Sequence, residues 1–455
     1  MGFRRGLGVA MSNCRKLFTK PFEKSCLVLL GLVGFVWGAS ASAENWPQWR
    51  GPRNDGTSTH GPVPIRWSAT ENVKWKTPLP GQGGATPIVW GDRIFLTSAD
   101  GDDLVLISLS AADGKELWRR KVTGGNQDAR AGEGNSASPS PSTDGKHVWA
   151  FFSTGILACY DFDGKEIWKT DVNERFGRID IQFGMTSTPA LDGDHLYLQL
   201  IHGPMRRGDG VRTGKVVKLD KLTGKTVWEV DRVTDADFEC KHSYASPFVY
   251  SSAGLKFLVV HGADCTTAHD LGDGHELWRF GGLNGPSAVN TGQYDGTFRF
   301  VASPAVGDGV VIIPTAKKGP TVALGIDDSL RGNIDGSSPL TRWFIPQTPD
   351  VAIPVIHDGL VYLLHNDGKL QCVDLATGKE YYFERTHSSQ HRVSPLVADG
   401  KLFFCGKDGV CTIVKAGRKF EILAQNDLGE AVTASPIVAN GTLYIRSYGH
   451  LFAFE

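Results

Sequence analysis

Six histidines occupy positions where an imidazole could bind a metal ion, hold a ligand or move a proton. They are His202, His242, His261, His365, His387 and His391. No H-x-H or H-E-x-x-H spacing joins any of them into a metal motif. Each could equally end a strand or bond to a loop carbonyl. The sequence therefore predicts no metal, and the histidines stay candidates for binding a ligand or partner.

Other polar residues belong to the same candidate set for ligand or partner binding. They are Arg130, Glu133, Asn135, Arg178, Gln182, Tyr244, Asp264, Lys317 and Arg392. The basic residues could hold an anionic ligand or an acidic partner segment, because charged donors bind oxyanions strongly. Glu133 and Asn135 beside Arg130 indicate mixed polarity instead. A solvated loop surface is the alternative.

No arrangement of residues indicates nucleophilic catalysis. Ser243 directly follows His242, but adjacent residues of an extended segment point to opposite sides. No G-x-S-x-G turn occurs in the chain. We expect no catalytic residue.

Four cysteines could form two disulfides. Cys405 and Cys411 flank a hairpin that would set them opposite one another. Cys240 and Cys265 are expected on the same face of one sheet. Free thiols are the alternative for each pair. No C-x-x-C spacing indicates a zinc site.

A repeat must position all of these residues. Each unit opens with a small residue and a proline, continues with short apolar strands joined by glycine-containing turns, and ends near an aromatic residue. The first two units are residues 85–118 and 137–168, and the others open at Thr188, Ser246, Ser303, Ile353, Ser394 and Ser435. Asp-Gly and Asn-Gly pairs supply positive φ at tight hairpins. Eight units predict an all-β fold, an eight-bladed propeller of four-stranded antiparallel blades.

The aromatic residue near the end of each unit is expected to pack between neighbouring blades. These residues are Trp118, Trp168, Trp228, Trp278 and Trp343, followed by Tyr382 and Phe420 in the sixth and seventh units. The eighth unit reaches the C-terminus before its last strand. Residues Asn72–Pro80, which contain Trp75, would supply that strand and close the ring, leaving no free sheet edge.

In a propeller, the loops from each outermost strand to the next blade share one end of the ring with the loops between second and third strands. Here these loops are long and polar, and the other turns are short. Because loops on a rigid scaffold commonly carry function, we expect the candidate residues at this end.

The first 43 residues have the form of a signal peptide. Six basic residues precede an apolar run from Cys26 to Gly38, and residues 41–43 are an A-x-A cleavage site. We expect a periplasmic or secreted monomer without a membrane span, in which residues 44–455 form one propeller domain. The signal carries six of the 48 basic and one of the 49 acidic residues, so the remaining net charge is −6. That charge disfavours binding to nucleic acid.

The units resemble the PQQ-like propeller repeat, whose A-x-[ST]-G-x-x-x-W signature stands here as residues 222–228 and 376–382. Residues 45–52 are also similar to the start of many exported bacterial propellers of this kind. The resemblance covers residues 45–455 and implies the propeller fold. Proteins with this repeat include outer-membrane assembly scaffolds and quinoprotein dehydrogenases.

The dehydrogenases in this group carry two adjacent cysteines against their cofactor, calcium ligands and a catalytic aspartate. This chain has no Cys-Cys pair and no C-x-x-C-H motif, so we expect no cofactor, with PQQ and calcium as the alternative. The sequence favours an exported, non-catalytic binding or scaffold protein whose polar loops take a protein or glycan partner. The alternatives are a quinone-dependent oxidoreductase of alcohols or sugars, and a sugar hydrolase or lyase at the same end.

Overall fold

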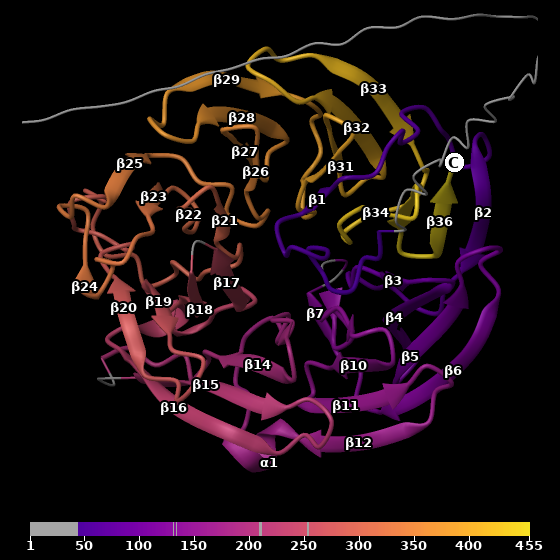
Figure 1. Ribbon diagram of the computed structural model, residues 1–455, viewed down its shortest axis with the longest axis horizontal. Coiled ribbons are helices and arrows are strands. Elements are labelled where there is room, and N and C mark those ends of the chain that lie inside the picture. The colour runs from indigo at the N-terminus through magenta and orange to yellow at the C-terminus, as the bar shows by residue number, and fades with distance from the viewer. Residues whose placement is uncertain (1–43, 131, 133, 209–211, 253) are drawn as a thin grey trace, which may run out of the picture. The chain divides into compact units, whose positions relative to one another are not determined.

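The computed structural model describes residues 44–130, 132, 134–208, 212–252 and 254–455. Within these residues eight four-stranded sheets surround a common axis, and the chain passes from sheet to sheet around the ring (Figure 1). The predicted fold class, an all-β eight-bladed propeller, is confirmed. The expected signal peptide, residues 1–43, lies outside the described residues.

The first four blades each run outward from a short inner strand. Blade one contains β3 (Ile88–Trp90), β4 (Arg93–Asp100), β5 (Asp103–Ser110) and β6 (Glu116–Thr123). Blade two contains β9 (Ser142–Thr143), β10 (His147–Phe151), β11 (Ile156–Asp161) and β12 (Glu166–Asp171). Blade three contains β13 (Ala190–Asp192), β14 (His195–Leu200), β15 (Arg212–Asp220) and β16 (Thr226–Thr234). Blade four contains β17 (Phe248–Ser252), β18 (Leu255–Gly262), β19 (Cys265–His269) and β20 (Glu276–Phe280).

The next four blades repeat this order. Blade five contains β21 (Ala305–Gly307), β22 (Val310–Ile313), β23 (Thr321–Gly325) and β25 (Thr341–Ile345). Blade six contains β26 (Val355–His357), β27 (Leu360–Leu364), β28 (Lys369–Asp374) and β29 (Glu380–Arg385). Blade seven contains β30 (Leu396–Ala398), β31 (Lys401–Cys405), β32 (Val410–Lys415) and β33 (Ile422–Asp427). Blade eight contains β34 (Ile437–Ala439), β35 (Thr442–Arg446), β36 (His450–Phe454) and β2 (Val73–Pro78).

The last sheet joins the two ends of the propeller sequence. The strand expected at residues 72–80 is β2, and it pairs antiparallel with β36, with Trp75 opposite Ala453 and Pro78 opposite His450. The two strands lie side by side in Figure 1, β2 in indigo and β36 in yellow.

Smaller elements are added to the blades. Strand β1 (Thr57–Ser58) pairs in parallel with inner strand β30, and β24 (Gly332–Ile334) pairs in parallel with outer strand β20. A hairpin of β7 (Asp128–Arg130) and β8 (Gly134–Asn135), helix α1 (Val172–Phe176) and 3-10 helix η1 (Phe238–Lys241) belong to segments between blades. Among the described residues, no helix has the length and apolar character needed to cross a membrane.

The spacing of glycine and tryptophan in the repeat has a structural cause. An indole N–H of one blade donates to a carbonyl in the turn between the third and fourth strands of the next blade, at 2.8–3.1 Å, for Trp75, Trp118, Trp168, Trp228 and Trp343. The turn glycine lies against that indole: a Cβ on Gly224, whose φ is 65°, would come within 2.8 Å of Trp168. Glycine is therefore needed both for the turn and for contact between blades.

Two aromatic positions depart from the expected pattern. Trp278 is buried, but its indole N–H has no hydrogen-bond partner within the described residues. Blade five replaces the usual turn with residues 326–340, which carry β24. In blade seven, Ala424 occupies the tryptophan position beside the β-bulge. Phe420 lies instead in the turn before β33, but it packs against the neighbouring blade as expected, on Tyr382 of blade six with ring centroids 5.4 Å apart.

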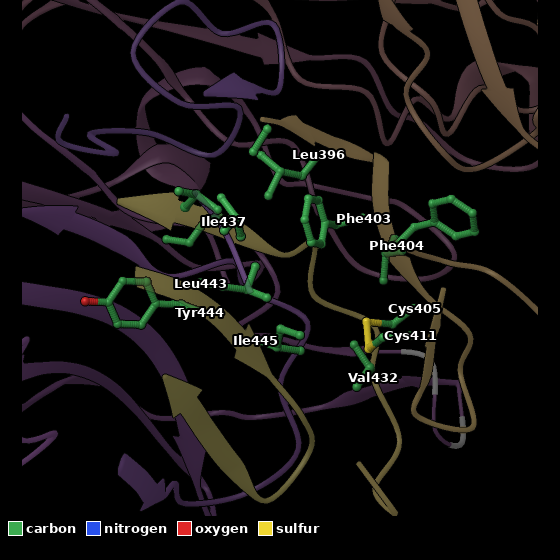
Figure 2. Close-up of a cluster of buried hydrophobic side chains, with 14 of the residues drawn as sticks. Leu396, Phe403, Phe404, Cys405, Cys411, Val432, Ile437, Leu443, Tyr444 and Ile445 are labelled. Carbon is green, nitrogen blue, oxygen red and sulfur yellow. A yellow bond between two sulfur atoms is a disulfide. The ribbon is translucent and has the colours of Figure 1, made fainter. Parts of the chain in front are cut away.

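One of the two expected disulfides forms. Cys405 and Cys411 face each other on β31 and β32 and are joined, inside a buried cluster shared by blades seven and eight (Figure 2). Cys240 and Cys265 are free, so the second pairing was wrong. Their thiols face different neighbours: Sγ of Cys240 donates to a backbone carbonyl at 3.2 Å, and Sγ of Cys265 accepts from Arg232 at 2.9 Å.

Candidate functional site

The two ends of the ring differ. The strand order places at one end the segments from each outer strand to the next inner strand, together with the connections between second and third strands. We call this end the loop face and the opposite end, with its short turns, the turn face. The long segments of the loop face are residues 124–141, 177–189, 235–247, 281–304 and 386–395.

A circle of hydrogen bonds surrounds the axis where the inner strands begin. The residue before each strand-opening proline donates its N–H to the hydroxyl of its counterpart in the next blade, at 2.8–3.3 Å. The members are Thr86, Ser140, Thr188, Ser246, Ser303, Ile353, Ser394 and Ser435. Ile353 has no hydroxyl, so the circle is broken between blades five and six. Blade two enters the circle with Ser140, two residues after Ser138, which is the counterpart of Thr86 in the expected units 85–118 and 137–168.

A pocket of about 290 Å³ lies on this axis, and we call it the axial pocket. Its wall includes the residue two positions before each opening residue, in all eight blades: Gly84, Ser138, Thr186, Tyr244, Val301, Val351, Arg392 and Thr433. Alternate residues of an extended segment point to the same side. This explains why the opening residues and the residues two positions before them both face the axis. The wall is completed by Trp49, Phe183, Arg299, Asp350 and Asn366, among others.

His202 and His242 lie close together on the loop face. Nε2 of His242 donates to the carbonyl of Gly203 at 2.8 Å, and its Nδ1 accepts from the N–H of Gln182 at 3.4 Å. Nδ1 of His202 accepts from the N–H of Asp180 at 3.3 Å. Burial lowers the pKa of His202 to about 4 and also lowers the pKa of His242. Both rings are therefore neutral near pH 7 and bind loop backbone.

His261 and His365 are buried within their blades. Nδ1 of His261 lies 2.8 Å from the hydroxyl of Thr266, and burial lowers its pKa to about 3. Nε2 of His365 lies 3.2 Å from the side-chain oxygen of Gln371, and burial lowers the pKa of this ring as well. These two imidazoles satisfy neighbouring polar groups.

His387 and His391 form a second neighbouring pair, with ring centroids 6.4 Å apart. Nε2 of His387 lies 2.7 Å from a carboxylate oxygen of Asp408, and Nδ1 of His391 lies 3.0 Å from the carbonyl of Ser389. Burial lowers the pKa of His391 to about 4. Across the described ranges, the one group with metal-ligand geometry is an exposed turn of Asp270, Asp273 and His275, which includes none of the six candidates.

Five of the other candidates lie in the pocket wall or on the surface. Tyr244 and Arg392 line the axial pocket. Arg178, Gln182 and Lys317 are exposed.

Asn135 is buried, and its side-chain amide donates to the carbonyl of Gln82 and accepts from the N–H of Ala137, so that it fixes loop backbone. The side chain of Arg130 and the whole of Glu133 lie outside the described part of the chain.

Asp264 belongs to a hydrogen-bonded cluster. The hydroxyl of Tyr294 donates to Oδ2 of Asp264 at 2.9 Å, and the amide of Asn284 donates to its Oδ1 at 3.2 Å. These bonds tie residues 281–304 to the turn between β18 and β19. Burial of the carboxyl raises the pKa of Asp264 to about 7, although both hydrogen bonds oppose the rise.

This cluster predicts a pH-dependent stability. The folded protein keeps a proton on Asp264 that the unfolded carboxyl, with an ordinary pKa of 3.8, releases. The free energy of unfolding should therefore fall as the pH rises from about 4 to about 7, by at most a few kcal/mol, and this contribution should be constant at higher pH. Urea unfolding at pH 5, 6, 7 and 8 measures the slope. Asp264→Asn should flatten it and Asp358→Asn, an exposed control, should not; equal slopes for D264N and wild type would contradict the assignment.

Sequence reasoning missed Trp49, Arg299, Asp350, Asn366 and Thr433 in the pocket wall. For Thr433 a signal existed, because it lies two residues before an opening Ser-Pro pair. The other four come from positions with no shared spacing.

The family described as outer membrane protein assembly factor BamB matches residues 58–199, 132–381 and 212–455. The outer membrane protein assembly factor BamB of Yersinia pestis is 22% identical over 310 residues, which cover 67% of this chain and 70% of that protein. The polyvinylalcohol dehydrogenase of Sphingopyxis sp. (strain 113P3) is 27% identical over 197 residues, which cover 41% of this chain but 28% of the dehydrogenase.

Among solved structures, the quinohemoprotein alcohol dehydrogenase from Comamonas testosteroni is similar, with a TM-score of 0.63 and 15% identity. The match covers 90% of this chain and 80% of that chain. At this identity the likeness shows the fold alone.

The similar fold of the quinohemoprotein raises the question of whether the axial pocket fits PQQ with calcium. Calcium takes six to eight oxygen ligands, commonly with several carboxylates. The described wall offers one carboxylate, Asp350, and no cysteine. The one disulfide, Cys405–Cys411, lies in a buried cluster and does not line the pocket. The residues present do not fit the calcium–quinone pair.

Proposed function

Because this chain belongs to the outer membrane protein assembly factor BamB family, we propose that it is an exported scaffold that binds a protein of the cell envelope through its loop face. The observation that carries this proposal is the contrast between the two ends of the ring: long polar segments at the loop face and short turns at the turn face. Binding functions on rigid scaffolds concentrate in such loops.

The loop face is organised before any partner arrives. The bond of His242 to Gly203 joins residues 235–247 to the connection after β14, and the bond of Asn284 to Asp264 joins residues 281–304 to the turn after β18. A preorganised surface loses less conformational entropy on binding. This supports a docking surface rather than a set of loops that fold on contact.

The exposed charges of the loop face are of both signs. Arg178, Arg206, Arg207, Lys317 and Lys318 are exposed there together with Asp128, Asp180, Asp235 and Asp295. Mixed charges of this kind fix the orientation of a partner, because like charges brought together are unfavourable.

Site-specific photo-cross-linking tests the proposal. A photoreactive residue at Arg178 or Lys317, in the exported protein in its own cells, should give discrete adducts with an envelope protein. The same residue at Lys115 or Lys225, exposed in turns at the turn face, should not. The double variant R178E/K317E should reduce adducts from a third loop-face position at least tenfold, and K115E/K225E should leave them unchanged.

Each other outcome contradicts the proposal. Adducts from the turn face alone would place the partner at the wrong end. Adducts that contain glycan and no protein would replace a protein partner with a carbohydrate one.

A quinone-dependent oxidoreductase is the second candidate, because the polyvinylalcohol dehydrogenases match part of the chain. Titration of the purified protein with PQQ and calcium, followed by absorbance and dye-linked oxidation of alcohols, tests it. Saturable PQQ binding with turnover would favour the enzyme over the scaffold.

A further inference from the structure

The axial pocket is a site for a small molecule at the centre of the ring. We propose that it binds a neutral polyhydroxylated molecule of about monosaccharide size, such as a hexose. Its volume of about 290 Å³ is at the lower end of the range of small-molecule sites. Such a ligand binds independently of the loop-face partner.

The circle of opening residues supplies hydrogen-bond donors to this pocket. Five of its hydroxyl-bearing members line the wall: Thr86, Ser140, Thr188, Ser394 and Ser435. Each hydroxyl accepts an N–H from a neighbouring blade. Within the described residues, none of the five donates its own proton to a protein acceptor. A hydroxyl in this state donates to a ligand, so the five together favour a ligand with several oxygen acceptors.

Two buried oxygens of the wall have no partner in the protein. They are Oγ1 of Thr433 and the side-chain oxygen of Asn366, which make no hydrogen bond within the described part of the chain. Leaving buried polar atoms unpaired is costly. The hydroxyls of a bound sugar would donate to both oxygens, so the wall presents acceptors as well as donors to the same ligand.

The residues two positions before the opening residues give the pocket two unlike sides. Blades eight, one, two and three contribute small residues, which are Thr433, Gly84, Ser138 and Thr186. Blades four, five and six contribute the larger Tyr244, Val301 and Val351. Phe183 extends this second side, with its ring centroid 6.3 Å from that of Tyr244. A sugar ring has an apolar C–H face that packs on aromatic and aliphatic side chains, while the hydroxyls at its edge reach the smaller residues.

The charges of the wall favour a neutral ligand. Arg299 pairs with Glu239 at 2.5 Å, and Arg392 is not free either, so neither guanidinium requires an anion. Asp350 is the one carboxylate of the described wall, and its Oδ1 accepts from the N–H of Lys317 at 3.0 Å. Its second oxygen accepts from a ligand hydroxyl, as carboxylate oxygens do. A ligand that carried its own carboxylate would bring a like charge close to Asp350.

The N-terminal segment, residues 44–58, supplies the wall from the turn face. Trp46 forms a β-bridge with Val89, and Nη1 of the buried Arg50 donates to the carbonyl of Pro395 at 2.9 Å. The segment thus runs from blade one to blade seven, and β1 continues along the inner edge of blade seven. Trp49, between these anchors, lines the pocket and adds a third aromatic ring to it. The sequence N-W-P-Q-W-R-G-P is therefore part of the site.

Calorimetric titration of the purified mature protein with D-glucose, D-galactose, D-glucuronate and cyclohexanol tests the proposal. Saturable binding at one site is expected for at least one of the two hexoses. Cyclohexanol, which has a ring of the same size but one hydroxyl, should bind at least tenfold more weakly, because it leaves the polar groups of the wall unpaired. Glucuronate should also bind at least tenfold more weakly than the hexose, because of the carboxylate of Asp350.

Two variants of similar shape separate binding from folding. Thr433→Val and Asn366→Leu remove oxygens that have no protein partner, so both should keep the wild-type Tm and bind the hexose several-fold more weakly. Thr291→Val, an exposed threonine outside the pocket wall, is the matched control and should bind as the wild type does.

Four results would each overturn the proposal. They are no binding of either hexose, equal binding of hexose and cyclohexanol, glucuronate binding as tight as that of the hexose, and hexose binding that T433V and N366L both leave intact. None of these outcomes depends on the cross-linking result.

Discussion

A chain that lacks residues 1–80 is expected to lose its stable fold, whereas a chain that lacks residues 1–43 should keep the full Tm. Residues 73–78 form β2, the outer strand of blade eight, which pairs with β36. Without β2, the backbone groups of β36 form an exposed edge, a template for aggregation. The deletion also removes Trp75, whose indole N–H donates to the carbonyl of Ala111 in blade one at 3.1 Å. Losing a buried tryptophan alone costs about 3–5 kcal/mol.

Thermal unfolding by circular dichroism and sedimentation velocity measure this effect. A third truncation, through Thr70, retains β2 but removes residues 44–70. It should remain folded, with a lower Tm, because the anchors of Trp46 and Arg50 are lost. A soluble monomer of the longest truncation, with a Tm within a few degrees of the mature chain, would show that the β2–β36 pairing is dispensable.

The fold could be predicted because each unit carries its own local signals. Glycine turns and opening prolines recur in every blade, and an indole recurs in all but blades six and seven, so that errors in one unit are corrected by the others. The local details that failed are those set by neighbours in space. Phe420 was assigned to the tryptophan position by its distance along the chain, but the turn of blade seven is longer than that of blade six. Lys415 donates its N–H to the carbonyl of Glu421, six residues on, whereas Asp374 of blade six donates to Lys379, five residues on. Ala424 therefore takes the tryptophan position.

The site was only partly predictable for a related reason. The sequence did not indicate the partners of the histidines: His242 bonds to the backbone of Gly203, whereas His261 and His365 are buried beside the side chains of Thr266 and Gln371. The prediction that Cys240 pairs with Cys265 was wrong because each thiol has another neighbour. Arg232 of blade three donates to Sγ of Cys265. The pocket residues Tyr244, Arg392 and Thr433 share an offset from the opening residue. That offset identifies pocket residues only once it is known that the eight inner strands face one axis.

Arg446 joins the last blade to the first, and Arg446→Leu is expected to lower the free energy of unfolding by about 3 kcal/mol. The side chain is fully buried, and its guanidinium donates to the carbonyls of Ala85 and Thr97 at 2.9 and 2.8 Å and to the hydroxyl of Ser98 at 3.0 Å. Leucine would leave these acceptors of blade one buried without a donor. Each such group costs about 1–3 kcal/mol.

Residue 83 must be a glycine to leave room for the side chain of Arg446. A Cβ on Gly83 would lie 1.8 Å from the guanidinium, so a residue with a side chain at position 83 would displace it. For a propeller of this length, about 3 kcal/mol corresponds to a decrease in Tm of about 3–4 °C. Arg446→Lys should retain part of the bonding and fall between wild type and R446L. Arg418→Leu, whose side chain is 66% exposed, should change the stability by less than about 0.5 kcal/mol. Equal Tm values for R446L and R418L would mean that the seam between blades eight and one is held by β2 and Trp75 without the arginine.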